Sequence, residues 1–270
     1  SSFLKELEQA REDGYESVKA LVRQEDILAT KEVYGTPLEK ASWMNEKDWE
    51  RLTVMRLYDE PTALHCIRTF LLAEKKLSEC HVKGVSLSSL IDEEVGTLEN
   101  FYRACLFHDV GKCCLPHAVL NNSLNDADLA KVLIEQMEKD GDTLLLTQIE
   151  ESVQAHYLGH TEDELAHFLE SVHPVRYVKI RYILSEEEVR NITNKIPGIH
   201  GDSTLADAIR FHEAKSGDIL MEEGEVVAAK IARGHHNYDN HQLEFPMASG
   251  LIGVSAKLEE FLAIADMYEA

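Results

Sequence analysis

An adjacent histidine and aspartate, His108-Asp109, form the stretch of this chain with the clearest capacity for chemistry. Imidazole nitrogens and carboxylate oxygens are common ligands of metal ions in proteins. Apolar residues recur at helical spacing from residue 98 to residue 106, and Gly111 then supplies a stop. The pair is therefore predicted to lie where a buried helix opens into a loop. A lone His-Asp pair is equally compatible with a structural role.

Five more residues of ligand type continue or directly follow apolar helical stripes, so they are predicted to face the interior of a helical protein. His212 follows Leu205 by seven positions, and Asp266 follows Leu262 by four. A carboxylate on an apolar face is costly to bury without a cation. Taken singly, each histidine could be a hydrogen-bonded core residue, and Asp266 could pair with a lysine. The other three residues are His65, His235 and His236.

Together these motifs resemble the HD superfamily of metal-dependent phosphohydrolases, and most closely its HD-GYP branch. The resemblance covers residues 49–270 apart from an insertion, and five separated motifs agree in order: residues 62–68, 108–116, 210–220, 231–236 and 264–270. By this resemblance Lys112 would contact the substrate phosphate or protonate the leaving oxygen. The metal ligands would be His65, His108, Asp109, His212, His235, His236 and Asp266.

This ligand set predicts a binuclear centre. Imidazole and carboxylate without thiolate favour iron or manganese, and Asp109 could bridge two divalent ions by giving one oxygen to each. Two six-coordinate ions offer about twelve positions, so seven side chains leave positions for hydroxide and phosphate. We expect a metal-bridging hydroxide to attack phosphorus in line. Asp109 and Lys112 would be the catalytic residues, and the substrate would be a small anionic nucleotide, a class that includes cyclic dinucleotides.

The chain also departs from the HD-GYP pattern. The His-His-Glu and Gly-Tyr-Pro segment of that branch is replaced after His236 by a different loop, of which only Phe245-Pro246 keeps the aromatic-proline ending. Some members carry a glutamate for a third metal ion where this chain has Pro61, so a two-metal site is predicted. The sequence ends four residues after Asp266. Because the family continues its helix there, we expect the natural chain to continue.

Two other function classes stay open at this point. Some proteins with the HD fold use a di-iron centre as an oxygenase, and Lys112 does not exclude that chemistry. Consumption of dioxygen would distinguish such an enzyme from a hydrolase. The third class is a non-catalytic nucleotide sensor descended from such an enzyme. Sensors of that kind tend to lose ligands, and this chain keeps seven, so the sensor ranks last.

Composition excludes several classes of protein. A net charge of −22 over 270 residues argues against binding a nucleic acid duplex. No apolar run is long enough to span a bilayer, so we expect no membrane partner. The five cysteines show neither C-x-x-C nor zinc-site spacing. They argue against a disulfide scaffold or a structural zinc and favour the reducing cytoplasm.

The predicted fold is mainly α, an HD-domain helical bundle at residues 49–270 with an α/β insertion at about residues 122–200, between the HD motif and His212. The insertion should begin with two helical pieces, near residues 129–137 and 149–169, followed by a β-rich run at residues 175–184. Arg176, Lys179 and Arg181 in that run could form a solvated strand face or a cationic lid. Residues 1–48 read as charged helices that could pack on the bundle, form a homodimer contact or join a regulatory domain.

Overall fold

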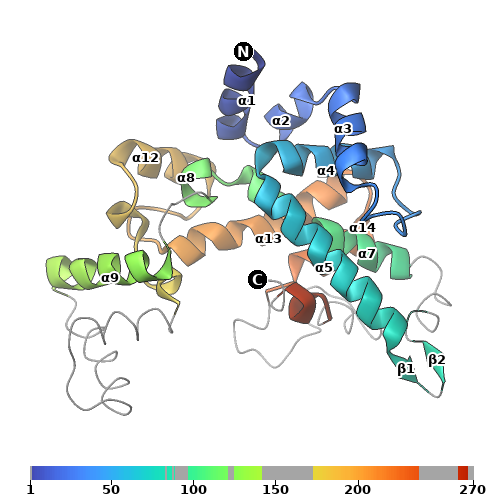
Figure 1. Cartoon of the computed structure of the whole chain (residues 1–270). Coiled ribbons are helices and arrows are strands. Elements are labelled where there is room, and N and C mark those ends of the chain that lie inside the picture. Colours follow the sequence, from blue (N-terminus) through green and yellow to red (C-terminus); the bar gives the residue numbers. More distant parts are fainter. Residues whose placement is uncertain are drawn as a thin grey trace. The chain divides into compact units, whose positions relative to one another are not determined.

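A computed structural model describes residues 2–82, 84–86, 88, 97–120, 125–141, 173–236 and 261–266. Within these ranges the protein is mainly helical, as the sequence predicts (Figure 1). The chain divides into two compact units. One comprises Ser1–Cys114 with Phe211–Ala270, and the other comprises Leu115–Arg210. All seven candidate ligands and Lys112 belong to the first unit.

The N-terminal helices pack on the central helices of the first unit. α1 (Ser2–Asp13) contacts α2 (Tyr15–Leu21), and both α2 and α3 (Gln24–Tyr34) contact α4 (Glu46–Tyr58). Arg11 Nε in α1 donates a hydrogen bond to the carbonyl of Leu57, at 2.9 Å. Of the roles that the sequence allows for this segment, packing on the bundle is therefore the one that the structure shows.

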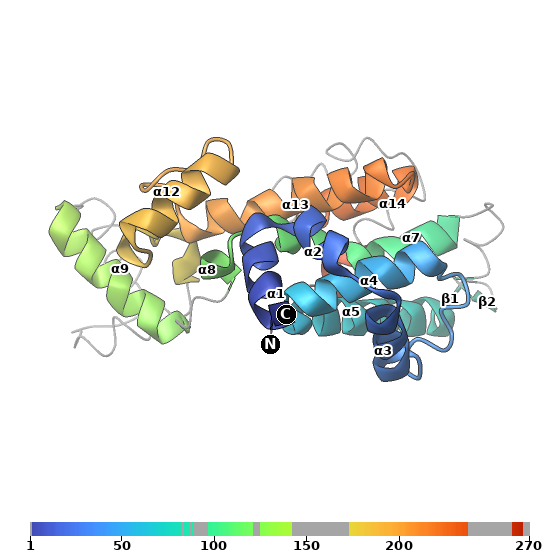
Figure 2. The same cartoon turned by 90° about the horizontal axis from the view of Figure 1, so that it is seen from above.

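The central helices are α4, α5 (Glu60–Glu79), α7 (Thr97–Phe107) and α14 (Val226–Arg233). α5 packs against α4 and α7, and α7 packs against α14 (Figures 1 and 2). The start of α5 is well defined in the sequence, because the Asp59 side chain accepts a hydrogen bond from the backbone N–H of Thr62 as an N-cap and Pro61 occupies the first turn. Fully burying each large apolar side chain contributes about 1.5–3 kcal/mol. The buried core residues include Leu52, Met55, Tyr58, Phe70, Leu77, Phe101, Leu106 and Phe107.

Short elements complete the first unit. A hairpin of two-residue strands, β1 (His81–Val82) and β2 (Val85–Ser86), follows α5 in an antiparallel arrangement. A 3-10 turn, η1 (Val110–Cys114), follows the His108-Asp109 pair, and α13 (Leu205–Glu222) enters this unit at residue 211. Residues 261–266 are helical. The helices predicted around residues 98–106 and 205–212 are thus confirmed.

A buried ionic network ties these helices together. Asp48 of α4 accepts hydrogen bonds from two arginines, Arg51 at 3.0 Å and Arg103 of α7 at 3.0 and 3.1 Å. Arg51 also donates to Glu223, directly after α13, and its guanidinium lies 4.5 Å from the ring centre of Phe107. Glu223 in turn pairs with Lys19 of α2 at 3.0 Å. Four helices therefore meet through charged groups that sequence periodicity did not single out.

The second unit contains α8 (His117–Leu120), α9 (Asp126–Asp140) and α12 (Glu186–Lys195), together with η2 (Pro174–Arg176) and η3 (Ile180–Tyr182). The helix predicted near residues 129–137 is confirmed as α9, whereas residues 149–169 lie outside the described ranges. The predicted β-rich run is wrong. Its residues form two 3-10 turns and one isolated bridge between Lys179 and Thr204. Pro174 starts the first turn, and burial of Val178 and Ile180 explains the apolar pattern that suggested a strand.

The basic patch predicted in that run is largely neutralised within the second unit. Lys179 and Arg181 both pair with Asp140, at 2.5 and 2.8 Å. Arg181 also pairs with Asp202 at 2.8 Å. These pairs favour the solvated-face interpretation over a cationic lid, because Lys179 and Arg181 already have acidic partners. Across the described residues, no helix is both long enough and apolar enough to cross a membrane.

We expect Asp48→Asn to lower the free energy of unfolding by about 3–5 kcal/mol, because it removes the fully buried carboxylate that two buried arginines share. The matched control is Glu79→Gln, which removes an exposed carboxylate from α5 and should change stability by less than about 0.5 kcal/mol. Urea unfolding with a chelator present measures both. Equal effects of the two variants would show that the network does not hold the helices.

Candidate metal centre

Every candidate ligand lies either directly after the end of a helix or on the inward-facing side of a helix. His65 stands in the second turn of α5, and His108-Asp109 directly follows α7. His212 faces inward from α13, and His235-His236 follows Gly234, which ends α14. The remaining ligand is Asp266, in the helical residues 261–266. Residues up to 201 positions apart in the chain are in contact here.

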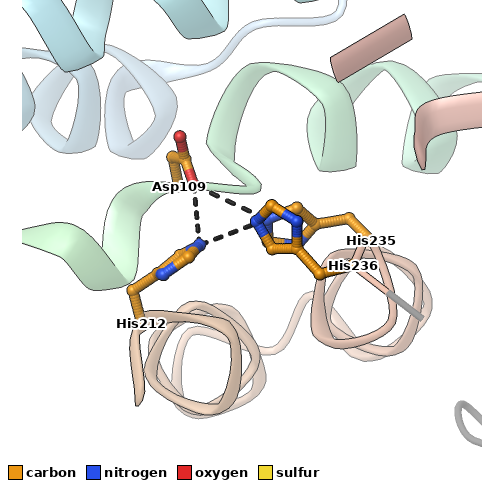
Figure 3. A group of neighbouring side chains, drawn as sticks. All are labelled: Asp109, His212, His235 and His236. Carbon is orange, nitrogen blue, oxygen red and sulfur yellow. Dashed lines mark hydrogen bonds and ion pairs between the residues drawn. The ribbon is translucent and has the colours of Figure 1, made fainter. Parts of the chain in front are cut away.

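One set of ligand atoms, the three-histidine group, consists of Asp109, His212, His235 and His236. Its ligand atoms lie within 4.8 Å of one another, and the side chains point toward a common centre (Figure 3). His212 Nε2 is 2.9 Å from Asp109 Oδ1 and 3.3 Å from His235 Nε2. Two atoms bound to one ion at about 2.1 Å each are at most about 4.2 Å apart. Small side-chain shifts would therefore place all four atoms on one cation.

A second set, the two-aspartate group, consists of His65, His108, Asp109 and Asp266, and its ligand atoms also lie within 4.8 Å of one another. Asp266 Oδ1 is 2.8 Å from His65 Nε2 and 3.0 Å from His108 Nε2. The same two imidazole nitrogens lie 3.7 and 3.6 Å from Asp109 Oδ2. This group holds two carboxylates and two imidazoles, so it is the more anionic of the two.

Asp109 belongs to both groups and divides its oxygens between them. Oδ1 faces His212 and His235 of the three-histidine group, whereas Oδ2 faces His65 and His108 of the two-aspartate group. A carboxylate that bridges two metal ions requires this division of its oxygens. The arrangement matches the bridging role that the sequence predicts for Asp109.

The hydrogen bonds of two histidines show that these residues suit a metal ion. His108 Nδ1 lies 2.9 Å from the carbonyl of Cys105, and His235 Nδ1 lies 2.5 Å from the carbonyl of Ala232. Because a carbonyl can only accept, Nδ1 carries the proton, and a neutral ring then presents a lone pair at Nε2. Both Nε2 atoms point into the groups. Lone pairs brought this close need a proton or a cation between them.

A further sign of fit is that Asp109 Oδ1, although buried, receives no hydrogen bond of good geometry from the described residues. His212 Nε2 lies 2.9 Å from it, but the same nitrogen also faces His235. One proton on His212 cannot serve both neighbours. Burying a carboxylate oxygen that lacks a hydrogen-bond donor is unfavourable in free energy, and a bound cation would compensate for it. The described residues therefore form groups that could hold metal ions.

Burial and charge set the protonation states at the centre. Burial lowers the pKa of His212 and of His235, and it lowers the pKa of His236 to about 4. These three imidazoles are thus neutral at pH 7, as metal ligands must be. Burial also acts to lower the pKa of His108, but the surrounding carboxylates of Asp109 and Asp266 outweigh it and raise that pKa well above its ordinary value.

The two carboxylates are ionised despite their burial. Burial acts to raise the pKa of Asp109, but Lys112 and His108 outweigh burial and hold that pKa well below its usual range. For Asp266, burial is outweighed in the same way by His108 and His65, so its pKa is also lowered. Two buried negative charges therefore stand side by side at the centre of the site.

Lys112 lies on the partly open side of the centre. Its ammonium is 2.6 Å from Asp109 Oδ2, and its side chain is 24% exposed. The side chain of His65 is 15% exposed, whereas those of His108, Asp109 and His212 are at most 2% exposed. Burial acts to lower the pKa of Lys112, but Asp109 outweighs it and raises that pKa. An anion can therefore reach a protonated lysine at the edge of the two-aspartate group.

The structure brings together all seven ligands predicted from the sequence, and it places Lys112 against one of them. Sequence reasoning missed the supporting residues. Among these, Cys66 Sγ lies 3.8 Å from His108 Nδ1, and the buried Ser216 contacts the backbone of Gly111. Neither has a spacing signal that could have revealed it. Comparison of the chain with protein-family models, with curated proteins and with solved structures finds no match.

We expect metal binding to the two groups to depend differently on pH. Because the pKa of His108 is raised, an ion entering the two-aspartate group must displace a proton. Its affinity should rise about tenfold per unit between about pH 6 and 8. The three-histidine group, whose imidazoles have lowered pKa values, should show little change over that range. Calorimetric titration with Mn²⁺ checks this, and equal slopes for both ions would contradict it.

Proposed function

We propose that this chain is a binuclear metal-dependent phosphohydrolase of the HD superfamily that hydrolyses a nucleotide phosphoester. The observation that carries the proposal is the division of the Asp109 oxygens between two groups of buried ligands. A protein that held one structural ion would need only one such group. The order of the motifs in the sequence supports the family assignment, and so does the mainly helical fold of the first unit.

The proposed ions are two divalent cations, iron or manganese. Both groups combine imidazole with carboxylate, and the nearest thiol, that of Cys66, has a pKa raised by burial, so it stays protonated and is a poor ligand. Two such ions bring about +4, against about −2 from Asp109 and Asp266, which leaves the site cationic for an anionic substrate. When bound, the ions would supply an acidified water and an electrophilic clamp on the phosphoryl oxygens.

The residues of the chain would position the substrate and the proton. Asp109 lies between His212 on one side and Lys112, which pairs with its Oδ2, on the other, so its oxygens face the two groups. Lys112 keeps its proton because its pKa is raised. A lysine with a raised pKa is a weak acid, so we assign it a hydrogen bond to a phosphoryl oxygen in preference to protonation of the leaving group. The partial exposure of Lys112 and His65 leaves the substrate an approach.

A nucleotide is the proposed substrate because charge restricts the choice. The net charge of the chain, −22, disfavours long polyanions over most of its surface, whereas a small phosphoester needs only the local charge of the centre. Cyclic dinucleotides belong to this class. The loop after His236, where the HD-GYP branch carries its motif, lies outside the described residues, so the proposal rests on the centre itself.

We expect Asp109→Ala to lower kcat on any phosphoester that the wild-type protein hydrolyses by on the order of 10³-fold, because both ions lose a ligand and several kcal/mol of transition-state stabilisation go with it. Metal content should fall in the same variant. Asp202→Ala, which removes an exposed carboxylate of the second unit, is the matched control and should leave both unchanged. The measurements are elemental analysis of protein purified without chelators and a screen of cyclic and linear nucleotides.

Retained hydrolysis with undiminished metal in Asp109→Ala would overturn the proposal. Turnover that consumes dioxygen would also overturn it and would favour an oxygenase.

We expect Lys112→Met to lower kcat by about 10²–10³-fold, because it removes a preorganised cation from the developing charge on phosphorus. Lys112→Arg should retain more activity, since it keeps the charge. The matched control is Lys75→Met, an exposed lysine of α5 that should have no effect. Steady-state kinetics of the metal-loaded protein measures all three. A pH profile that loses its basic limb in Lys112→Met would instead assign Lys112 to proton transfer.

A further inference from the structure

The loop that carries Asp109 is joined to α13 by a contact between Gly111 and Ser216. The backbone N–H of Gly111 donates to Ser216 Oγ at 2.8 Å, and Ser216 is fully buried. The approach is so close that a Cβ at position 111 would stand 2.0 Å from the carbonyl oxygen of His212 and 2.5 Å from the backbone nitrogen of Ser216. Only glycine fits there, so two backbones meet at this point.

This contact spans two ligands of the three-histidine group. Gly111 is two residues after Asp109, and Ser216 is one helical turn after His212. A movement of the loop away from α13 would therefore lengthen the distance between Asp109 Oδ1 and His212 Nε2, which is 2.9 Å. In the two-aspartate group, His65 lies in α5 and His108 directly follows α7, so neither histidine is on α13.

α13 meets the segment that bears the other two histidines through a different kind of contact. Arg233, two residues before His235, pairs with Asp218 at 2.5 Å, and both side chains are about half exposed. An exposed pair of this type contributes little. The contact of Ser216 is buried, and removal of its hydroxyl would leave the N–H of Gly111 without a partner. Of the two contacts, that of Ser216 is the one able to fix the geometry.

We propose that Ser216 is a positioning residue that sets the affinity of the three-histidine group for its metal ion by holding the Asp109 loop against α13. The inference rests on the proposed binuclear centre and adds a determinant that is not itself a ligand. Loss of the hydroxyl should weaken the ion of the three-histidine group more than the other ion, because Asp109 serves both groups whereas His212 serves only that one.

The test is a calorimetric titration of the chelator-treated full chain with Mn²⁺. Ser216→Ala should lower the affinity for one of the two ions by about 10-fold to 100-fold, the usual effect of losing a group that orients a ligand. Its titration should resemble that of His212→Ala and differ from that of His65→Ala. The matched control is Ser203→Ala, which removes a like bond, from the His200 N–H to Ser203 Oγ at 3.0 Å, in the second unit. It should bind both ions as wild type does.

A second pair of variants separates positioning from folding. The side chains of threonine and valine have nearly the same shape and differ in the hydroxyl. Ser216→Thr should therefore keep the ion whose binding Ser216→Ala weakens, and Ser216→Val should lose it. Equal binding by the two variants, or an equal loss of both ions in Ser216→Ala, would overturn the inference while the binuclear centre stands. A wild-type protein that takes up fewer than two ions would overturn the centre itself and this inference with it.

Discussion

The pair of buried carboxylates, Asp109 and Asp266, is the constraint on which the rest of the first unit depends. Their burial, at 1% and 5% exposure, is unfavourable unless positive charge lies beside them. Lys112 supplies part of that charge, to one oxygen of Asp109. The imidazoles of the three-histidine group supply none at neutral pH, because burial lowers their pKa values. Metal ions would complete the neutralisation.

Ligands that sit at helix ends are only as well placed as the helices themselves. The network around Asp48 joins α4 to α7, which leads directly to His108 and Asp109. Arg51 extends the network to Glu223 at the end of α13 and packs its guanidinium on Phe107, the residue before His108. Ion pairs are directional, so they fix how one helix is rotated against the next, a property that apolar packing leaves looser. This explains how buried charge that yields little net stability can still serve the metal centre.

Residues in long periodic helices could be predicted from the sequence, because burial of one helical face leaves a regular signature. His212 and Asp266 were placed on inner faces by that signature, and the structure puts them there. The prediction of a strand at residues 175–184 was wrong, since the apolar residues of this run are buried for tertiary reasons and, among the described residues, the run makes only an isolated bridge. The partners of Lys179 and Arg181 could not be foreseen, because Asp140 lies about 40 residues away. Ser216 is a serine within a helix, and nothing in its neighbours distinguishes it before the Asp109 loop folds against it.

The two groups are chemically unequal, and the inequality bears on how a phosphoester would be handled. The three-histidine group has Asp109 as its one carboxylate, and His236 is its one partly exposed member. The two-aspartate group has two carboxylates and the partly exposed His65, and Lys112 stands at its edge. More negative ligands leave a bound ion less electrophilic, while exposure gives a substrate access to it. In the proposed mechanism, an incoming phosphate would meet Lys112 at the edge of the two-aspartate group, and the more electrophilic ion would lie on the other side of Asp109. Under the proposed function, the carboxylate of Asp109, which faces both groups, is the element that would let two ions act on the same phosphorus.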